Sequence, residues 1–328
     1  MFARFGLTLP RCFLIALLCL AGCAHPTPAP AAKPGYSVIN EMPRFWRYYE
    51  QAHDKDPATQ ARLYQELVVA GAPHLYSPYV LSLDTPGLSF EEALTRRLTM
   101  VKERLEPHYD NVRKLSATLE QDLPRYDARF RREFPDMAYT GKVYFLNALG
   151  TFDGAVRELE GQTTLLFGVD MIAFIYGPGP EAEALFDHEL FHIYHGQFFH
   201  SLGEDAVWES LWREGLATYV AERMNPNATR KTIFGLPEDM PDRAQAALPK
   251  LAGLLREKLD SKEHADYDTF FAGAKEGREI PSRSGYFVGY QVAKKLAGDR
   301  SLAELAHLHG PELREAIRGA LVELEQGR

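Results

Sequence analysis

The pattern of hydrophobic and polar positions changes near Gly141, and it is helical before that point. Asp56 followed by Pro57 predicts the start of one helix, because Asp caps helix N-termini and Pro is accepted at the first helical position. Gly71 is expected to end this segment. Residues 36–140 are therefore predicted to be a helical N-terminal region.

A second helical run starts at Ser89, whose spacing to Glu92 is that of a capping box. The run extends to about Leu119, and Pro107 is expected to break or kink it. These segments carry no recognisable chemistry. We therefore expect a scaffold, or one wall of a cleft.

After Gly141 the pattern becomes that of strands. Lys142–Leu149 is short, β-branched and aromatic, and Phe152-Asp153-Gly154 is typical of a turn. Thr163–Tyr176 is expected to be a second strand or strand pair, with Gly168 at a bulge or bend. Two Gly-Pro pairs at 177–180 break the chain before the next helix.

Helical patterning returns after Gly235. Ser301 and Glu304 have capping-box spacing, and Gly310-Pro311 is expected to separate the last two helices. Strands flanked by helices on both sides predict a mostly helical α+β fold.

The segment from His188 to His192 contains the pattern H-E-x-x-H within an apolar stretch. Residues four apart lie on one face of a helix, so both imidazoles can bind one ion. Glu189 can then act as a general base on a water held by the metal. Imidazole suits zinc, but chance produces this pattern in roughly a few per cent of comparable chains, so it needs confirming context.

Zinc needs a third protein ligand, and three arrangements can be compared. His195 lies near the same helix face, but one straight helix separates it from His188 by about 10 Å. The metzincin pattern needs Gly at 195 and His at 198, whereas this chain has His195 and Phe198. Glu214 lies about twenty residues after His192, on a segment with helical periodicity. The loop between the two segments allows this second helix to pack beside the first. Its alternative is an ordinary surface carboxylate.

The N-terminus has the pattern of an export signal. Arg4 and Arg11 accompany an apolar run that is too short for a stable membrane helix. This run ends at Leu20-Ala21-Gly22-Cys23, which resembles the lipobox of bacterial lipoproteins. Residues 1–22 are predicted to be the signal peptide, and Cys23 is predicted to carry the lipid. The alternative is an ordinary cleaved signal.

Residues 23–35 are expected to be a Pro/Ala-rich spacer after the lipidated Cys. In Gram-negative lipoproteins, an Asp directly after the lipidated Cys tends to retain the protein at the inner membrane. This chain has Ala24 there, so the pattern favours the outer membrane facing the periplasm. Contact with the membrane is expected through the lipid alone. All three cysteines, Cys12, Cys19 and Cys23, lie in or at the end of the signal. Any metal site must therefore use His and carboxylates. The net charge of −8 argues against a nucleic-acid partner.

The order of strands, H-E-x-x-H helix and Glu-bearing helix resembles the zincin metallopeptidases of gluzincin type. The strings around Phe152, Phe167, His188, Glu214 and Gly285 resemble the predicted zinc-dependent proteases of the DUF2268 family, over roughly Gly141 to Gly298. The resemblance implies zinc held by His188, His192 and Glu214, with Glu189 as the base. It implies a zincin-like region at 141–328, with a small mixed or antiparallel sheet packed on the metal helix and a helical C-terminal part.

In zincins an edge strand before the metal helix binds the substrate backbone. Thr163–Tyr176 is the candidate, and its alternative is a core strand. Gly215 and Ala217 are small, so we expect the Glu214 helix to approach the metal helix closely.

Thr218 stands where related enzymes have an Asp that orients a ligand His. Asp187, Asp170 and His195 are possible substitutes. Tyr286 and Tyr290, spaced i, i+4 and preceded by Arg283, are candidates to stabilise an oxyanion, against the alternative of core packing. His200 and His264 are expected to be surface or loop histidines.

These observations predict a lipid-anchored zinc metallopeptidase of the bacterial cell envelope that hydrolyses a peptide or protein substrate. Two alternatives remain open. One is a catalytically inactive zincin-fold lipoprotein for binding or assembly, and the other is a zinc amidase acting on a cell-wall component. The intact Glu189 argues against the first.

Overall fold

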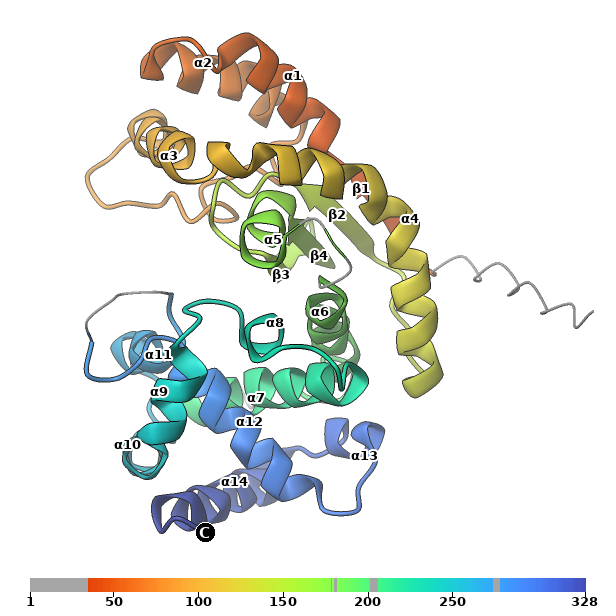
Figure 1. The fold of residues 1–328 in the computed structure, drawn as a ribbon, viewed down its shortest axis with the longest axis vertical. Helices are drawn as coiled ribbons and strands as arrows, with labels where there is room; N and C mark the ends of the chain where they lie inside the picture. The colour runs from red at the N-terminus through yellow and green to blue at the C-terminus, as the bar shows by residue number, and fades with distance from the viewer. Residues whose placement is uncertain (1–34, 178, 180–181, 201–205, 274–277) are drawn as a thin grey trace, which may run out of the picture. The chain divides into compact units, whose positions relative to one another are not determined.

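The computed structural model describes residues 35–177, 179, 182–200, 206–273 and 278–328 (Figure 1). Residues 32–328 form one compact unit. The predicted signal peptide, Cys23 and all of the predicted spacer except Gly35 lie outside the described residues. Within the described part of the chain, no helix has the length and apolar character needed to cross a membrane.

Residues 36–140 are mostly helical, but this region also contributes the strand β1 (Ser37–Asn40), which the sequence pattern did not predict. Asp56 caps its helix by accepting from the Thr59 N–H, and Ser89 and Glu92 form the predicted capping box. A short 3-10 helix at Glu106–His108 contains Pro107 and separates the two long helices, of which the second continues well past Leu119. The elements are α1 (Met42–Ala52), α2 (Pro57–Leu67), η1 (Val69–Gly71), α3 (Phe90–Arg104), η2 (Glu106–His108) and α4 (Tyr109–Glu133).

A four-stranded mixed sheet forms the centre of the chain, in the order β1-β2-β4-β3. Its strands are β1 (Ser37–Asn40), β2 (Lys142–Leu146), β3 (Gly154–Leu159) and β4 (Gln162–Gly168). The strands β1, β2 and β4 are parallel to one another, and β3 pairs with β4 in the antiparallel direction at the edge of the sheet. β3 and β4 form a hairpin whose two loop residues, Glu160 and Gly161, both have positive φ, as a tight type I′ connection requires.

The prediction that Thr163–Tyr176 continues as strand is wrong in its second half. The strand ends at Gly168, and Val169–Tyr176 forms the helix α5. A continuous apolar run does not distinguish a buried strand from a buried helix, which is why the pattern misled. β4 is also an interior strand, so the edge strand of the sheet on this side is β3.

The helix α6 (Glu183–His195) carries the H-E-x-x-H pattern and packs against β3 on one side and α7 (Val207–Met224) on the other (Figure 1). α4 packs against both α5 and α6, so the N-terminal region covers part of the metal helix. The α+β class, mostly helical with a small mixed sheet on this helix, is confirmed.

The remaining helices lie after α7, and the most extensive helix packing is between α7 and α12. Ser301 and Glu304 form the predicted capping box. The elements are α8 (Arg230–Phe234), α9 (Met240–Ala246), α10 (Leu248–Glu257), α11 (His264–Phe270), α12 (Ser284–Ala297), α13 (Leu302–Ala306) and α14 (Gly310–Glu325).

Gly215, which was expected to bring α7 close to α6, instead lies in the contact between α7 and α12. A Cβ on Gly215 would lie 2.1 Å from the carbonyl carbon of Gly289, and a Cβ on Gly289 would lie 2.3 Å from the Leu211 oxygen. Gly215 and Gly289 therefore allow α7 and α12 to cross with their backbones in contact. The expectation for Gly215 is corrected: its partner is α12.

Candidate metal centre

Three side chains from two helices direct donor atoms at one point. The Nε2 atoms of His188 and His192, on α6, lie 3.0 Å apart. The Oε2 atom of Glu214, on α7, lies 3.5 Å from the first and 3.4 Å from the second. The structure therefore brings together the three residues that the sequence pattern nominated as ligands.

This donor set fits zinc. A tetrahedral zinc ion with bonds of about 2.0–2.1 Å separates its ligand atoms by about 3.3 Å, close to the spacings found here. Two imidazole nitrogens and one carboxylate oxygen are ligands that zinc accepts, and a fourth position stays open. Glu189 lies beside the two histidines, with ligand atoms of all three within 4.8 Å of one another.

His195 is not part of this donor set. Its ring is buried and stacks between Phe191 and Phe199, with centroids at 5.4 and 4.8 Å. Burial lowers its pKa to about 3, so it is a neutral histidine packed at the edge of the site.

Burial and charge interactions shift the pKa values of all three donors. Burial would raise the pKa of Glu214, but the charge of His192 and hydrogen bonds from both histidines hold it well below its usual range. Burial lowers the pKa of His188. His192 is also buried, yet the Glu214 charge raises its pKa. Glu214 is thus a carboxylate at neutral pH.

The side chain of Glu189, on α6, packs against Gly154, the first residue of β3. Its side chain is 7% exposed, and a Cβ on Gly154 would lie 2.4 Å from its carboxylate. A larger residue at position 154 would therefore require the Glu189 side chain to shift. Burial raises the pKa of Glu189 to about 8, with the nearby His192 opposing the shift. Such a carboxyl group can both take and give a proton near neutral pH.

Among the residues that the structure describes, no hydrogen bond joins Asp170, Asp187 or His195 to a ligand histidine. Asp170 accepts from the backbone N–H groups of Ala148 and Gly150 and so supports the loop after β2. Thr218 donates to the Glu214 carbonyl, at 2.7 Å, within its own helix. Asp187 has a different role in the site.

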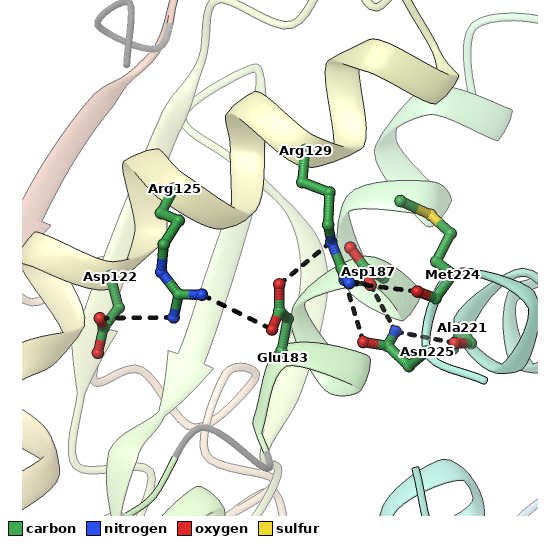
Figure 2. Close-up of polar contacts among 8 residues, drawn as sticks. All are labelled: Asp122, Arg125, Arg129, Glu183, Asp187, Ala221, Met224 and Asn225. Atoms are coloured by element: carbon green, nitrogen blue, oxygen red, sulfur yellow. Dashed lines mark hydrogen bonds and ion pairs between the residues drawn. The ribbon is translucent and has the colours of Figure 1, made fainter. Parts of the chain in front are cut away.

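Asp187 belongs to an ion-pair network that joins three helices (Figure 2). It precedes His188 on α6, is fully buried, and contacts Arg129 of α4. Asn225, the C-cap of α7, donates to Asp187 at 2.6 Å and accepts from Arg129 at 3.1 Å. Arg129 also pairs with Glu183, at 3.1 Å, and donates to the Met224 carbonyl, at 3.2 Å. We call Arg129, Asp187 and Asn225 the interhelix clamp.

The interhelix clamp fixes the start of the metal helix against the end of the helix that carries Glu214. Because His188 follows Asp187 directly, a shift of Asp187 would move a ligand. The N-terminal region therefore contributes to the site through α4, which sequence patterns did not reveal, since Arg129 lies about sixty residues before the motif in an unremarkable helix.

Tyr286, at the start of α12, faces the metal site. It lines the same pocket as the donor set, and its ring centroid lies 6.5 Å from that of His188. Burial raises its pKa well above 10, so its hydroxyl stays protonated and can donate. The Arg283 guanidinium lies 4.4 Å from the Tyr286 ring centroid and also lines the pocket.

The expectation for Tyr290 is corrected. Its hydroxyl donates to the Glu222 carboxylate, at 2.8 and 2.9 Å, and its ring packs against Phe234 and Phe287. It does not line the pocket. Tyr290 lies one turn after Tyr286 on α12, and its side chain packs among the helices away from the pocket. His200 and His264 are exposed, as predicted.

The donor set opens into a pocket of about 1070 Å³. Its walls include parts of β3, α6, α7, α8, α11 and α12 and the segment before β2. The pocket residues that sequence reasoning missed include Arg157, Arg213 and Tyr267. Arg213 could have been noticed as the neighbour of Glu214, but nothing in the pattern marked the other two.

Residues 177–309 match the DUF2268 family, described as a predicted Zn-dependent protease. The resemblance seen in the sequence is confirmed for this segment, which contains the donor set, Glu189 and Tyr286. The DUF2268 match starts after α5, so the sheet and the N-terminal helices lie outside it. No curated protein and no solved structure matches the chain.

Proposed function

We propose that this chain is a zinc metallopeptidase that hydrolyses peptide bonds at the α6–α7 site. The observation that carries the proposal is the convergence of His188, His192 and Glu214 at zinc spacing, with Glu189 beside them. The DUF2268 description agrees with it.

Zinc, when bound, lowers the pKa of a coordinated water to about 7 and polarises a carbonyl. Glu189 is placed to take the proton of the attacking water and to pass it to the leaving amine. Tyr286 stays protonated and supplies a hydrogen-bond donor for the negative charge that develops on the carbonyl oxygen.

The strand β3 supplies the proposed binding surface for the peptide backbone. It is the last strand of the sheet, and its residues 154–158 line the pocket. An extended peptide can add to such an edge through main-chain hydrogen bonds. β3 thus takes the role that the sequence pattern assigned to Thr163–Tyr176.

A decisive experiment compares purified wild type with Glu189→Gln and with Glu120→Gln, an exposed carboxylate on α4. We expect about one zinc per chain in all three proteins, and peptide hydrolysis at least about 100-fold slower in Glu189→Gln alone. Wild type without zinc, or an equally active Glu189→Gln, would contradict the proposal. Zinc without hydrolysis of any peptide would favour a binding or assembly role.

We further propose that the chain is anchored by lipid at Cys23 and acts in the bacterial cell envelope, at the outer membrane facing the periplasm. The apolar run ending at Leu20-Ala21-Gly22-Cys23 supports this. Wild type grown with a labelled fatty acid should carry the label and sediment with membranes, whereas Cys23→Ser should do neither. Label retained by Cys23→Ser would exclude this attachment site.

A further inference from the structure

Three arginines line the pocket, and none of them forms an ion pair with a carboxylate among the residues that the structure describes. Arg283 donates to the Leu236 carbonyl and lies over the Tyr286 ring. The other two are Arg157 and Arg213. Arg157 lies on β3, where its side chain donates to the Val156 carbonyl at 2.9 Å. Arg213 immediately precedes Glu214 on α7, and no hydrogen bond or ion pair to it is found within the described ranges. Other arginines of the chain, such as Arg256 and Arg318, pair with acidic side chains.

The carboxylates of the pocket are already engaged elsewhere. Asp153 accepts from the Tyr176 hydroxyl, at 3.0 Å, and from the Gly154 N–H. Glu158 accepts from the Thr163 hydroxyl. Glu214 contacts the two histidines, and Glu189 lies beside them. Within the described part of the chain, neither Arg157 nor Arg213 therefore forms an ion pair, in a protein whose net charge is −8.

Both arginines act on the same small region. The charges of Arg213 and Arg157 each oppose the rise that burial causes in the pKa of Tyr267, a pocket residue on α11. Both arginines line the same pocket as the donor set and Glu189. Arg157 lies on β3, the proposed substrate-binding strand, and Arg213 lies on α7, the helix of Glu214.

We propose that Arg157 and Arg213 bind a carboxylate of the substrate next to the bond that is cut, so that the enzyme prefers acidic peptides. A guanidinium forms paired, charge-assisted hydrogen bonds with a carboxylate, and this geometry favours it over a neutral amide of the same shape. The carboxylate is that of an Asp or Glu side chain or that of a free C-terminus. The inference rests on the peptidase function proposed above.

The test uses quenched fluorescent peptides that differ at one position. The first arm places Glu, Gln or Lys at each site around the cleaved bond, with the C-terminus amidated. The second arm keeps neutral side chains and compares a free C-terminal carboxylate with an amide. We expect kcat/KM for the carboxylate member of one arm to exceed that of its neutral partner by at least about tenfold.

Matched variants assign the preference to the two arginines. Arg157→Gln and Arg213→Gln should each reduce the ratio of kcat/KM between carboxylate and neutral peptides, and the double variant should bring it close to one. Arg223→Gln, which removes an exposed charge from the same helix α7, should keep the wild-type ratio. A ratio is unaffected by differences in the fraction of folded enzyme.

The outcomes separate the two proposals. Wild type that cleaves Glu, Gln and Lys peptides equally well, or variants that keep the full preference, would overturn the carboxylate site while leaving the peptidase function intact. Absence of zinc and of all hydrolysis would instead remove the peptidase function.

Discussion

At the residue scale, the contact between Gly154 and Glu189 sets the position of the proposed base. A Cβ at residue 154 would overlap the Glu189 carboxylate. We expect Gly154→Ala to lower kcat by about 10- to 100-fold, because small displacements of a catalytic group cost this much. Steady-state kinetics on a zinc-loaded enzyme measures the effect. Gly319→Ala, where the helix surface is open, is the control and should retain full activity.

Asp170 makes stability depend on pH in an unusual direction. Burial raises its pKa to about 6, although hydrogen bonds from backbone N–H groups, those of Ala148 and Gly150 first, oppose the shift. The folded state therefore binds a proton that the unfolded state releases near pH 4, and stability falls as the pH rises from about 4 to 6. The melting temperature of wild type, relative to Asp170→Asn, should fall over this interval. A constant or increasing difference would contradict the assignment.

At the scale of elements, the interhelix clamp couples the N-terminal region to the metal site. Arg129→Ala leaves the fully buried Asp187 without its cation, which we expect to cost about 3 kcal/mol of unfolding free energy. Zinc affinity should fall as well, because the clamp holds α6 against the end of α7. Urea unfolding and a competitive zinc indicator measure the two effects.

Arg125→Ala is the matched control for the clamp. Arg125 lies one turn earlier on α4, is 57% exposed, and pairs only at 3.7 and 3.9 Å with Asp122 and Glu183 (Figure 2). Its loss should change stability by less than about 1 kcal/mol. Partial recovery of zinc affinity in Arg129→Lys would identify the charge as the active feature. Equal effects of Arg125→Ala and Arg129→Ala would contradict the role of the clamp.

The sequence predicted elements where local chemistry decides them. The capping boxes at Ser89 and Ser301, the Pro107 break and the H-E-x-x-H helix follow from interactions within a few residues. It failed where the answer depends on distant contacts. The end of β4 at Gly168, the edge position of β3 and the pairing of Gly215 with α12 depend on segments far along the chain. The role of Arg129 could not be predicted for the same reason, because its partners Asp187 and Asn225 lie far along the chain.

At the scale of the whole molecule, the site depends on segments outside the family match. β1 pairs with β2, and α4 packs against α5 and α6. A fragment of residues 141–328 would expose these surfaces, and we expect it to aggregate or to lose cooperative unfolding, whereas residues 32–328 should unfold in one transition. Circular dichroism melts distinguish the two. A fragment with a sharp transition would show that the later region folds independently.

Under the proposed binding mode, the edge position of β3 would restrict the shape of any peptide that reaches the site. Pairing with this strand requires several consecutive residues in an extended conformation, which a segment held within a folded helix does not offer. A folded neighbour in the same compartment would therefore be cut only as fast as it opens locally. Such an enzyme would distinguish damaged proteins from intact ones by their local structure, and its turnover on a given protein would measure how often that protein exposes an extended segment.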